Sequence, residues 1–263
     1  MKSFYVAVRL LLPLSALLTS CAVYVPTVPC TPLLRSKSEV EITAALRLSS
    51  LEADVAWSPA PHVLLAGEMA LQRTGGQDSR NGPTGPVVTA DYSGHHFQGG
   101  VGLGTYWLLG ERQQFYLGAL SGVGVAKADL YDQTGEFFAI ILPIFGPAVP
   151  VHYQANYWRY YGQLYAAQQA SPKVTYGFSF RTTVVNYREV LRDGQPVSYS
   201  PAQVFYEPHA FLRYGQGVVQ GVTTFGYSFP GTPSLEAEQL LTPTTWLISL
   251  GIVFRPTSLR HKN

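Results

Sequence analysis

The sequence has little charge and almost no cysteine. Charged residues make up 13% of its 263 residues, about half the share that is typical of soluble domains. The two cysteines, Cys21 and Cys30, cannot form the multi-disulfide framework that stabilises many small secreted domains. The formal net charge is +2, and Lys2 and Arg9 lie in the leader described below, so the rest of the chain is near neutral. We therefore expect no nucleic-acid partner.

The sequence also lacks the motifs of common catalytic and binding sites. It has no metal-ligand spacing, nucleophile elbow or phosphate loop, and the glycine-containing stretch 81–86 lacks the lysine that a phosphate loop needs. We therefore expect no metal, no dissociable cofactor and no catalytic residue. After Cys21 no apolar run is long enough for a membrane helix, because the nearest, 137–149, is interrupted by proline and glycine. If the chain enters a membrane, it must do so with β-strands.

The first 20 residues have the pattern of a secretory signal peptide: a basic start, a short apolar run at 10–18 and then small residues. The sequence LTSC at 18–21 resembles the lipobox of bacterial lipoproteins. This resemblance implies acylation of the Cys21 thiol, cleavage before it and acylation of the new amine. The alternative is an ordinary cleavage site followed by a core cysteine. Ala22 in place of aspartate implies passage to the outer membrane in bacteria that use aspartate as a retention signal.

The dominant pattern after residue 38 is alternation with a period of two, which predicts β-strands. In 245–254 one face carries Trp246, Ile248, Leu250, Ile252 and Phe254, and the segments 96–107 and 173–184 alternate in the same way. Ten strands are predicted, at about 39–48, 51–58, 62–72, 96–109, 114–128, 157–170, 173–189, 205–214, 218–229 and 245–255.

The predicted connections alternate between short turns and the longer segments 73–95, 129–156, 190–204 and 230–244, as in membrane β-barrels. The mature chain is similar to small outer-membrane β-barrel proteins of Gram-negative bacteria, here with a lipoprotein leader. The resemblance implies an all-β fold: a single antiparallel up-and-down transmembrane β-barrel of about ten strands, or eight strands and a separate hairpin. Two features depart from the family pattern, namely a short first hairpin and a C-terminus that continues beyond its last aromatic residue, Phe254.

We expect four segments: a signal peptide at 1–20, a lipidated N-terminal linker at 21–38, the barrel at 39–256 and a tail at 257–263. An even strand number puts both ends of the barrel on the short-turn side, so a lipid on Cys21 is expected in the inner leaflet, beneath the barrel. The linker is rich in proline and apolar residues and is expected to dock at or inside the periplasmic mouth. The apolar loop 129–156 is expected to cover the opposite mouth, touch lipid headgroups or bind a partner.

Ten charged or polar residues fall on the inward faces of the predicted strands. Charges at membrane depth are tolerated inside a barrel, where they are paired or hydrated. We interpret the ten as an ion-pair network that fills a narrow lumen. The alternatives are a charged pore lining and a buried acid–base site at Glu207 and His209. The expected network comprises Glu41, Arg47, Glu52, Asp54, Glu68, Arg159, Arg181, Glu207, His209 and Arg213.

Three functions are consistent with this pattern. The first is a non-enzymatic outer-membrane lipoprotein with a structural, adhesive or surface-interaction role for its loops, with outer-membrane lipids and a surface or periplasmic protein as partners. The second is a lipid-tethered, lipocalin-like periplasmic barrel that binds an apolar ligand; it requires the face from Trp246 to Phe254 to point inward. The third is an outer-membrane lipid-modifying enzyme, which requires an opening in the wall at the depth of Glu207 and His209.

Overall fold

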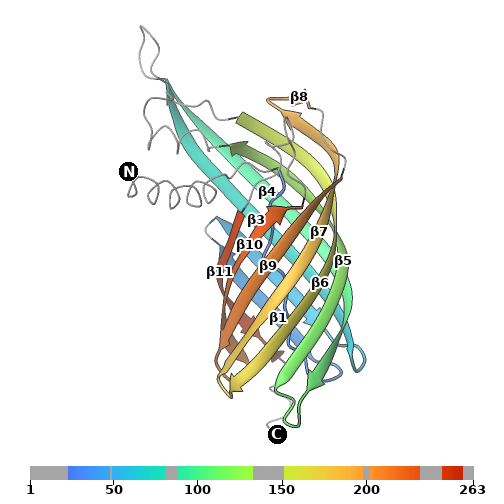
Figure 1. Ribbon diagram of the computed structural model, residues 1–263. Helices are drawn as coiled ribbons and strands as arrows, with labels where there is room; N and C mark the ends of the chain where they lie inside the picture. The colour runs from blue at the N-terminus through green and yellow to red at the C-terminus, as the bar shows by residue number, and fades with distance from the viewer. Residues whose placement is uncertain are drawn as a thin grey trace, which may run out of the picture.

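A computed structural model describes residues 23–47, 49–80, 88–132, 151–197, 202–231 and 245–256. These residues form a tall barrel of antiparallel strands (Figure 1). The expected signal peptide, Cys21, the apolar stretch 137–149 and the tail lie outside the described residues. Within the described ranges, no helix is long and apolar enough to cross a membrane.

Ten strands make the wall, and each pairs with the next along the chain until β11 closes the ring against β1. The prediction of a closed antiparallel barrel is confirmed, with ten strands rather than eight. The strands are β1 (Val40–Arg47), β2 (Ser50–Trp57), β3 (Val63–Arg80), β4 (Val88–Leu109), β5 (Phe115–Asp132), β6 (Val151–Ser171), β7 (Val174–Arg192), β9 (Ala202–Tyr214), β10 (Val219–Pro230) and β11 (Thr245–Phe254), and the two-residue β8 (Gln195–Pro196) pairs with the end of β7.

The outer surface is apolar. Along β11 the side chains from Trp246 to Phe254 on the predicted face are between 37% and 68% exposed, whereas Leu247, Ser249 and Val253 point inward and are buried. The other strands alternate in the same sense. Together these exposed side chains form a surface that we call the apolar belt, which includes Leu46, Leu51, Leu71, Phe97, Leu117, Val125, Leu164, Phe178, Leu212, Phe225 and Leu250.

Glycines allow the tight turns at one end of the barrel. Gly110, Gly215 and Gly217 have φ of +86°, +128° and +79°, values that residues with a Cβ rarely adopt. At the opposite end β3 and β4 extend beyond the rest of the wall, because β4 pairs with β5 only from His95 onward. The two strands continue as a projecting ribbon (Figure 1). The predicted strands 62–72 and 96–109 omit this ribbon, since the first ends too early and the second begins too late, because the ribbon is polar and does not alternate.

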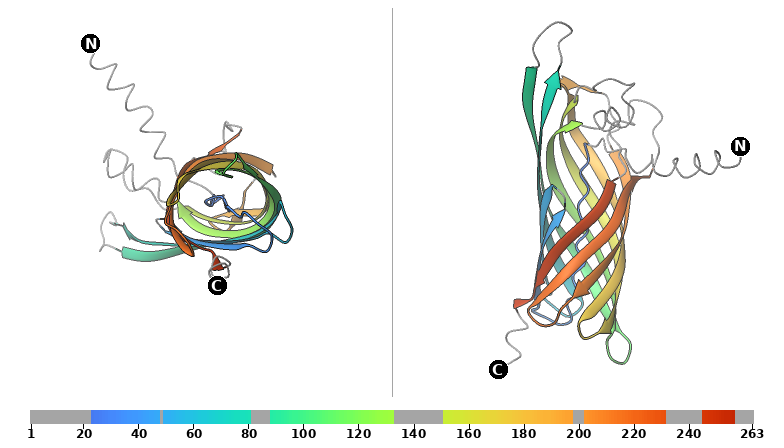
Figure 2. Two further views of the ribbon diagram at one scale, coloured as in Figure 1. Left: turned by 90° about the horizontal axis from the view of Figure 1, so that it is seen from below. Right: turned by 90° about the vertical axis from the view of Figure 1, so that its left-hand side faces the viewer.

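Residues 23–35 form an extended segment inside the barrel, which we call the strap (Figure 2). Val23 packs in a cluster with Tyr153 and Val190 near the long-loop end. At the other end the Arg35 guanidinium donates to the Gln113 carbonyl oxygen at 3.3 Å, beside a short turn. The strap therefore runs through the whole lumen.

This path corrects one expectation. We expected the linker at or inside the short-turn mouth, with its lipid beneath the barrel. It does lie inside, but Val23 is at the long-loop end.

Candidate functional site: the strap-filled lumen

The strap has no β-strand partner, so other groups must satisfy its backbone. Three of its residues are prolines, which have no N–H to satisfy. Inward carboxylates accept from two of the remaining N–H groups: Val28 donates to Glu52 Oε2 at 2.8 Å and Leu33 to Glu41 Oε2 at 3.4 Å. The polar lining of the lumen thus takes the place of a neighbouring strand.

The carbonyl oxygens of the strap are satisfied in the same way, by inward donors from different strands. Four such hydrogen bonds are Arg47 to the oxygen of Pro26 at 2.6 Å, Gln163 to Cys30 at 2.7 Å, Arg213 to Thr31 at 2.5 Å and Tyr165 to Pro32 at 2.9 Å. Because these donors are spread around the ring, they hold the strap near the middle of the lumen.

A buried ionic layer crosses the lumen at mid-height. Glu68 pairs with Arg159 and with Arg181, and Nη2 of Arg181 lies 3.1 Å from Glu68 Oε2. The Arg181 guanidinium also lies over the Tyr161 ring, 4.3 Å from its centroid. Both arginines are fully buried. Since a buried charge is tolerated only when it is paired and hydrogen-bonded, Glu68 is essential to both guanidiniums.

A second ionic layer lies near the short turns. Glu41 accepts two hydrogen bonds from Arg213, at 2.9 Å and 3.0 Å, and lies 2.7 Å from Nη2 of Arg255. Arg255 follows directly after β11, so this layer joins the chain end of the barrel to the start of β1. Arg255 is absent from the predicted network, because it follows the last alternating residue, Phe254.

Glu207 is bonded to the strap instead of to a cation. Its carboxylate accepts from Tyr24 Oη at 2.8 Å, from Thr183 at 2.9 Å and from Ser228 at 3.3 Å. His209 is 2% exposed on the same strand, and no hydrogen bond joins its side chain to the Glu207 carboxylate among the contacts of the described residues. The geometry of a base with an orienting partner is therefore not assembled here.

Seven of the ten predicted network residues form ion pairs, and Glu207 is hydrogen-bonded to hydroxyl groups. Arg47 lies 3.7 Å from Glu52, and the two ionic layers hold five more. Asp54 faces Glu68 across the β2–β3 pair, and within the described ranges neither Asp54 nor His209 has a cation or anion within ion-pair distance. The prediction missed the role of the strap as the common partner. The period-two alternation of strand 157–170 places Gln163 and Tyr165 on the inward face, whereas the linker sequence contains no pattern that points to Tyr24.

Inward glycines make room for tyrosine rings. A Cβ added at Gly118 would overlap the Tyr165 ring, and one added at Gly102 would lie 2.7 Å from Tyr161 Oη. These rings belong to a buried cluster that also contains Cys30 and Leu33 of the strap. Tyr165 is the direct cross-strand neighbour of Gly118, so the glycines make room for rings from adjacent strands.

Two ionisable groups beyond the apolar belt have shifted pKa values. Burial, and then the nearby Arg255 guanidinium, lower the pKa of Arg35. Burial by itself would raise the pKa of Asp129, but hydrogen bonds from His152 at 2.7 Å and Gln154 at 3.0 Å outweigh it and lower that pKa. The lowered pKa disfavours the charged form of Arg35 and favours the charged form of Asp129.

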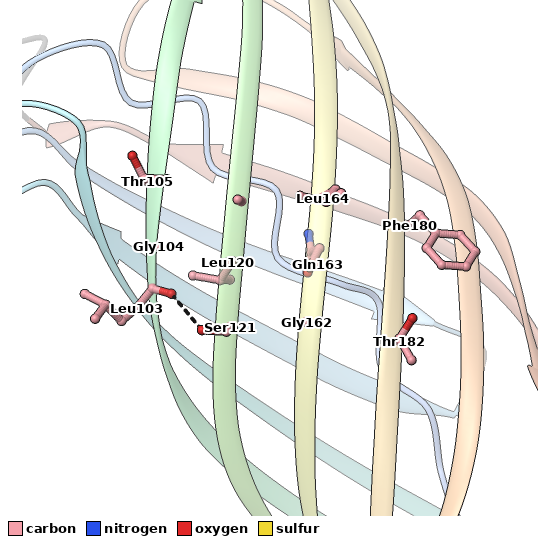
Figure 3. A pocket seen from close by; sticks show the side chains of 11 residues that line it. Leu103, Gly104, Thr105, Leu120, Ser121, Gly162, Gln163, Leu164, Phe180 and Thr182 are labelled. Carbon is pink, nitrogen blue, oxygen red and sulfur yellow. Dashed lines mark hydrogen bonds between the residues drawn. The ribbon is translucent and has the colours of Figure 1, made fainter.

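The outer wall has a hollow of about 610 Å³ over β4 to β7 (Figure 3). Its floor contains Gly104, Ala119 and Gly162, and Leu164 and Phe180 stand beside it. No charged side chain lines it. In the described part of the chain, no group of three or more His, Cys, Asp or Glu side chains could hold a metal ion. This hollow offers mainly apolar contact.

No protein-family model matches the chain, and no curated protein matches it. Among solved structures it is similar to the outer membrane protease OmpT from Escherichia coli, with 8% identity, a TM-score of 0.43, and coverage of 84% of this chain and 94% of OmpT. LpxR from Salmonella typhimurium is 9% identical with a TM-score of 0.36, over 82% and 99% of the two chains. The NanC porin is 11% identical with a TM-score of 0.31, over 82% and 98%. At these values none of them bears on the function of this chain.

Proposed function

We propose that the protein is a non-enzymatic, lipid-anchored barrel of the outer membrane of a Gram-negative bacterium, with a lumen closed by its own N-terminal strap. The carrying observation is the combination of an apolar outer surface with a strap that is hydrogen-bonded to the lumen along its length. A bilayer offers no water to backbone groups, and a closed ring of strands leaves none unpaired. The function then lies at the surface, in the ribbon and the long loops.

The other two functions have less support. A lipocalin-like carrier requires an inward apolar face on β11, whereas that face points outward. A lipid-modifying enzyme at Glu207 and His209 requires access from the membrane, but these side chains are 0% and 2% exposed and Glu207 is occupied by Tyr24. We therefore propose neither.

The anchor belongs to the same proposal. In outer-membrane barrels the long loops face outward and the short turns face the periplasm. Because Val23 lies at the long-loop end, a lipid on Cys21 would insert in the outer leaflet. Loss of metabolic labelling with an alkyne fatty acid in a Cys21→Ser variant would test the lipidation itself.

Membrane-impermeant maleimide on intact cells tests the topology. Lys37→Cys places a thiol in the exposed stretch after the strap, at the short-turn end, and Asp193→Cys places one in an exposed turn at the other end. The native Cys30 thiol is buried and contributes no background. We expect labelling of the Asp193→Cys variant alone. Labelling of Lys37→Cys alone would reverse the orientation, and labelling of both only after lysis would rule out a surface position.

Ion conductance in planar bilayers tests the closed lumen. The wild-type protein is expected to show no steady conductance, and a chain that begins at Ser36 is expected to conduct, because it lacks the strap. A boiling-dependent shift in gel mobility confirms that each chain has folded. Equal conductance of the two folded chains would contradict the proposal.

A further inference from the structure

The wall is incomplete above the hairpin that joins β1 and β2. The pairing of β1 with β11 ends at Leu46 and Leu250, and that of β2 with β3 ends at Ser50 and Gln72. Beyond these points, among the described residues, β11 pairs only with β10 and β3 only with β4. Within the described ranges β1 and β2 thus do not reach the long-loop end, and we call the gap above them the window.

A cavity of about 620 Å³ occupies the window. It is lined both by the inward residues Arg47 and His96 and by the outward residues Leu51 and Phe97. The cavity lies where β1 and β2 end beside the longer β3 and β4, so residues of both faces border it.

The chemistry of the window is amphipathic and basic. The apolar belt continues up to its lower edge, where Leu46 and Leu51 are 67% and 47% exposed. Arg73 and His95 also line the cavity and none of its lining residues is acidic, whereas the Arg47 guanidinium is already paired with Glu52 in the lumen. The Arg73 guanidinium above an apolar surface is complementary to an anionic group that carries hydrocarbon chains.

Two buried polar atoms at the window have no hydrogen-bond partner within the described residues. They are Nδ1 of His96 and Oε1 of Gln72, and both residues line the cavity. Gln72 Nε2 donates to Ser49 Oγ at 2.9 Å, which fixes the direction of the amide. Since buried polar atoms in proteins are almost always satisfied, these two atoms indicate that a polar group fits between them.

From these observations we infer that the window binds the phosphate-bearing headgroup of an anionic membrane lipid. The headgroup contacts Arg73 and the unpartnered atoms of Gln72 and His96, and the acyl chains follow the apolar belt below. This lipid site goes beyond the proposed function. Only the position of the lipid in the outer leaflet rests on the proposed function. Binding itself can be measured in detergent, where the orientation of the protein in a membrane has no influence.

Native mass spectrometry of the full-length protein, released from neutral micelles, tests the inference. The probes are dilauroyl-phosphatidylglycerol, dilauroyl-phosphatidylcholine and glycerol 3-phosphate. We expect one phosphatidylglycerol to be retained, with about tenfold weaker binding to an Arg73→Ser variant, which corresponds to loss of about 1.4 kcal/mol. The matched control is Arg188→Ser, because Arg188 is also exposed near the long-loop end but lies over Trp158, away from the window.

Several outcomes would overturn the inference. Equal weakening by Arg188→Ser would show general electrostatic attraction. Equal retention of phosphatidylcholine would show that the headgroup charge is not recognised. Binding of glycerol 3-phosphate as tight as that of the lipid would show a free phosphate site. A Leu71→Ser variant distinguishes a lipid site from a free phosphate site. The polar side chain on the outer wall should weaken binding of the lipid and leave binding of glycerol 3-phosphate unchanged.

Discussion

The lumen and the window differ in how their charged groups are paired. Within the lumen network five carboxyl groups stand among five guanidiniums, and the strap bonds to both kinds: Glu41, Glu52, Asp54, Glu68 and Glu207 with Arg47, Arg159, Arg181, Arg213 and Arg255. At the window, Arg73 stands without a carboxylate among the lining residues, next to unpartnered polar atoms. Balanced and bonded charges stabilise a fold, whereas unbalanced charges at an open edge are available to a ligand. The contrast separates the structural part of the molecule from the part that can recognise something.

Removal of the carboxylate in the middle layer should have the largest effect on the balanced region. A Glu68→Ala variant leaves Arg159 and Arg181 buried without their shared partner. We expect a loss of about 3–5 kcal/mol in the free energy of unfolding, measured by urea titration in micelles with gel mobility as the readout. Glu111→Ala, in an exposed short turn, is the control. A loss in Glu68→Ala no larger than in this control would mean that the layer is not structural.

Packing in the lumen should tolerate less change than the outer wall. Gly118→Ala places a methyl group against the Tyr165 ring, whereas Gly162 has no atom within 4 Å of an added Cβ. Overpacking is expected to destabilise the first variant by about 1–3 kcal/mol and to leave the second near wild type, in the same urea titration. Equal midpoints for the two glycine variants would contradict the tight tyrosine packing.

The strap should be weakened by loss of a single hydroxyl. Tyr24→Phe removes the hydrogen bond to Glu207, and we expect a loss of about 1.5 kcal/mol because the acceptor is buried. Tyr176→Phe is a matched control, since the Tyr176 hydroxyl donates to Gln168 at an exposed position. If both variants unfold at the same urea concentration, the Tyr24 bond does not hold the strap.

Acidification should lower the stability of the protein by a smaller amount, through Asp129 at the long-loop end of the barrel. The pKa of Asp129 is lowered in the folded protein by His152 and Gln154, so the folded state binds this proton less readily than the unfolded state. The stabilisation is present above the unfolded pKa of about 3.9 and is lost as the pH falls through the lower folded value. We expect this loss to lower the free energy of unfolding by under about 1 kcal/mol. The unfolding of Asp129→Asn should lack this part of the pH dependence, and an identical pH profile would refute the assignment.

Much of this barrel could be predicted because strand alternation is a local property. The outward direction of Trp246 and Leu250, and the inward direction of Arg159 and Arg181, follow from parity within one strand. The path of the strap could not be predicted, since an extended proline-containing segment has no periodic face and many of its partners lie more than 100 residues away, up to 183. The window could not be predicted from the sequence either, because it arises from the unequal lengths of strands that become neighbours only when the ring closes.

The strap makes the molecule a threaded ring. The ring is closed by hydrogen bonds between the first and last strands, β1 and β11, and the chain that precedes β1 passes through it. A segment so tightly contacted cannot easily slide in through a finished barrel. We therefore expect it to be laid along the interior of the curved sheet before β11 meets β1, with closure as the last step of assembly. It also means that a pulling force on the N-terminus would act along the barrel axis and draw the strap toward the long loops, while the strands of the wall stay paired.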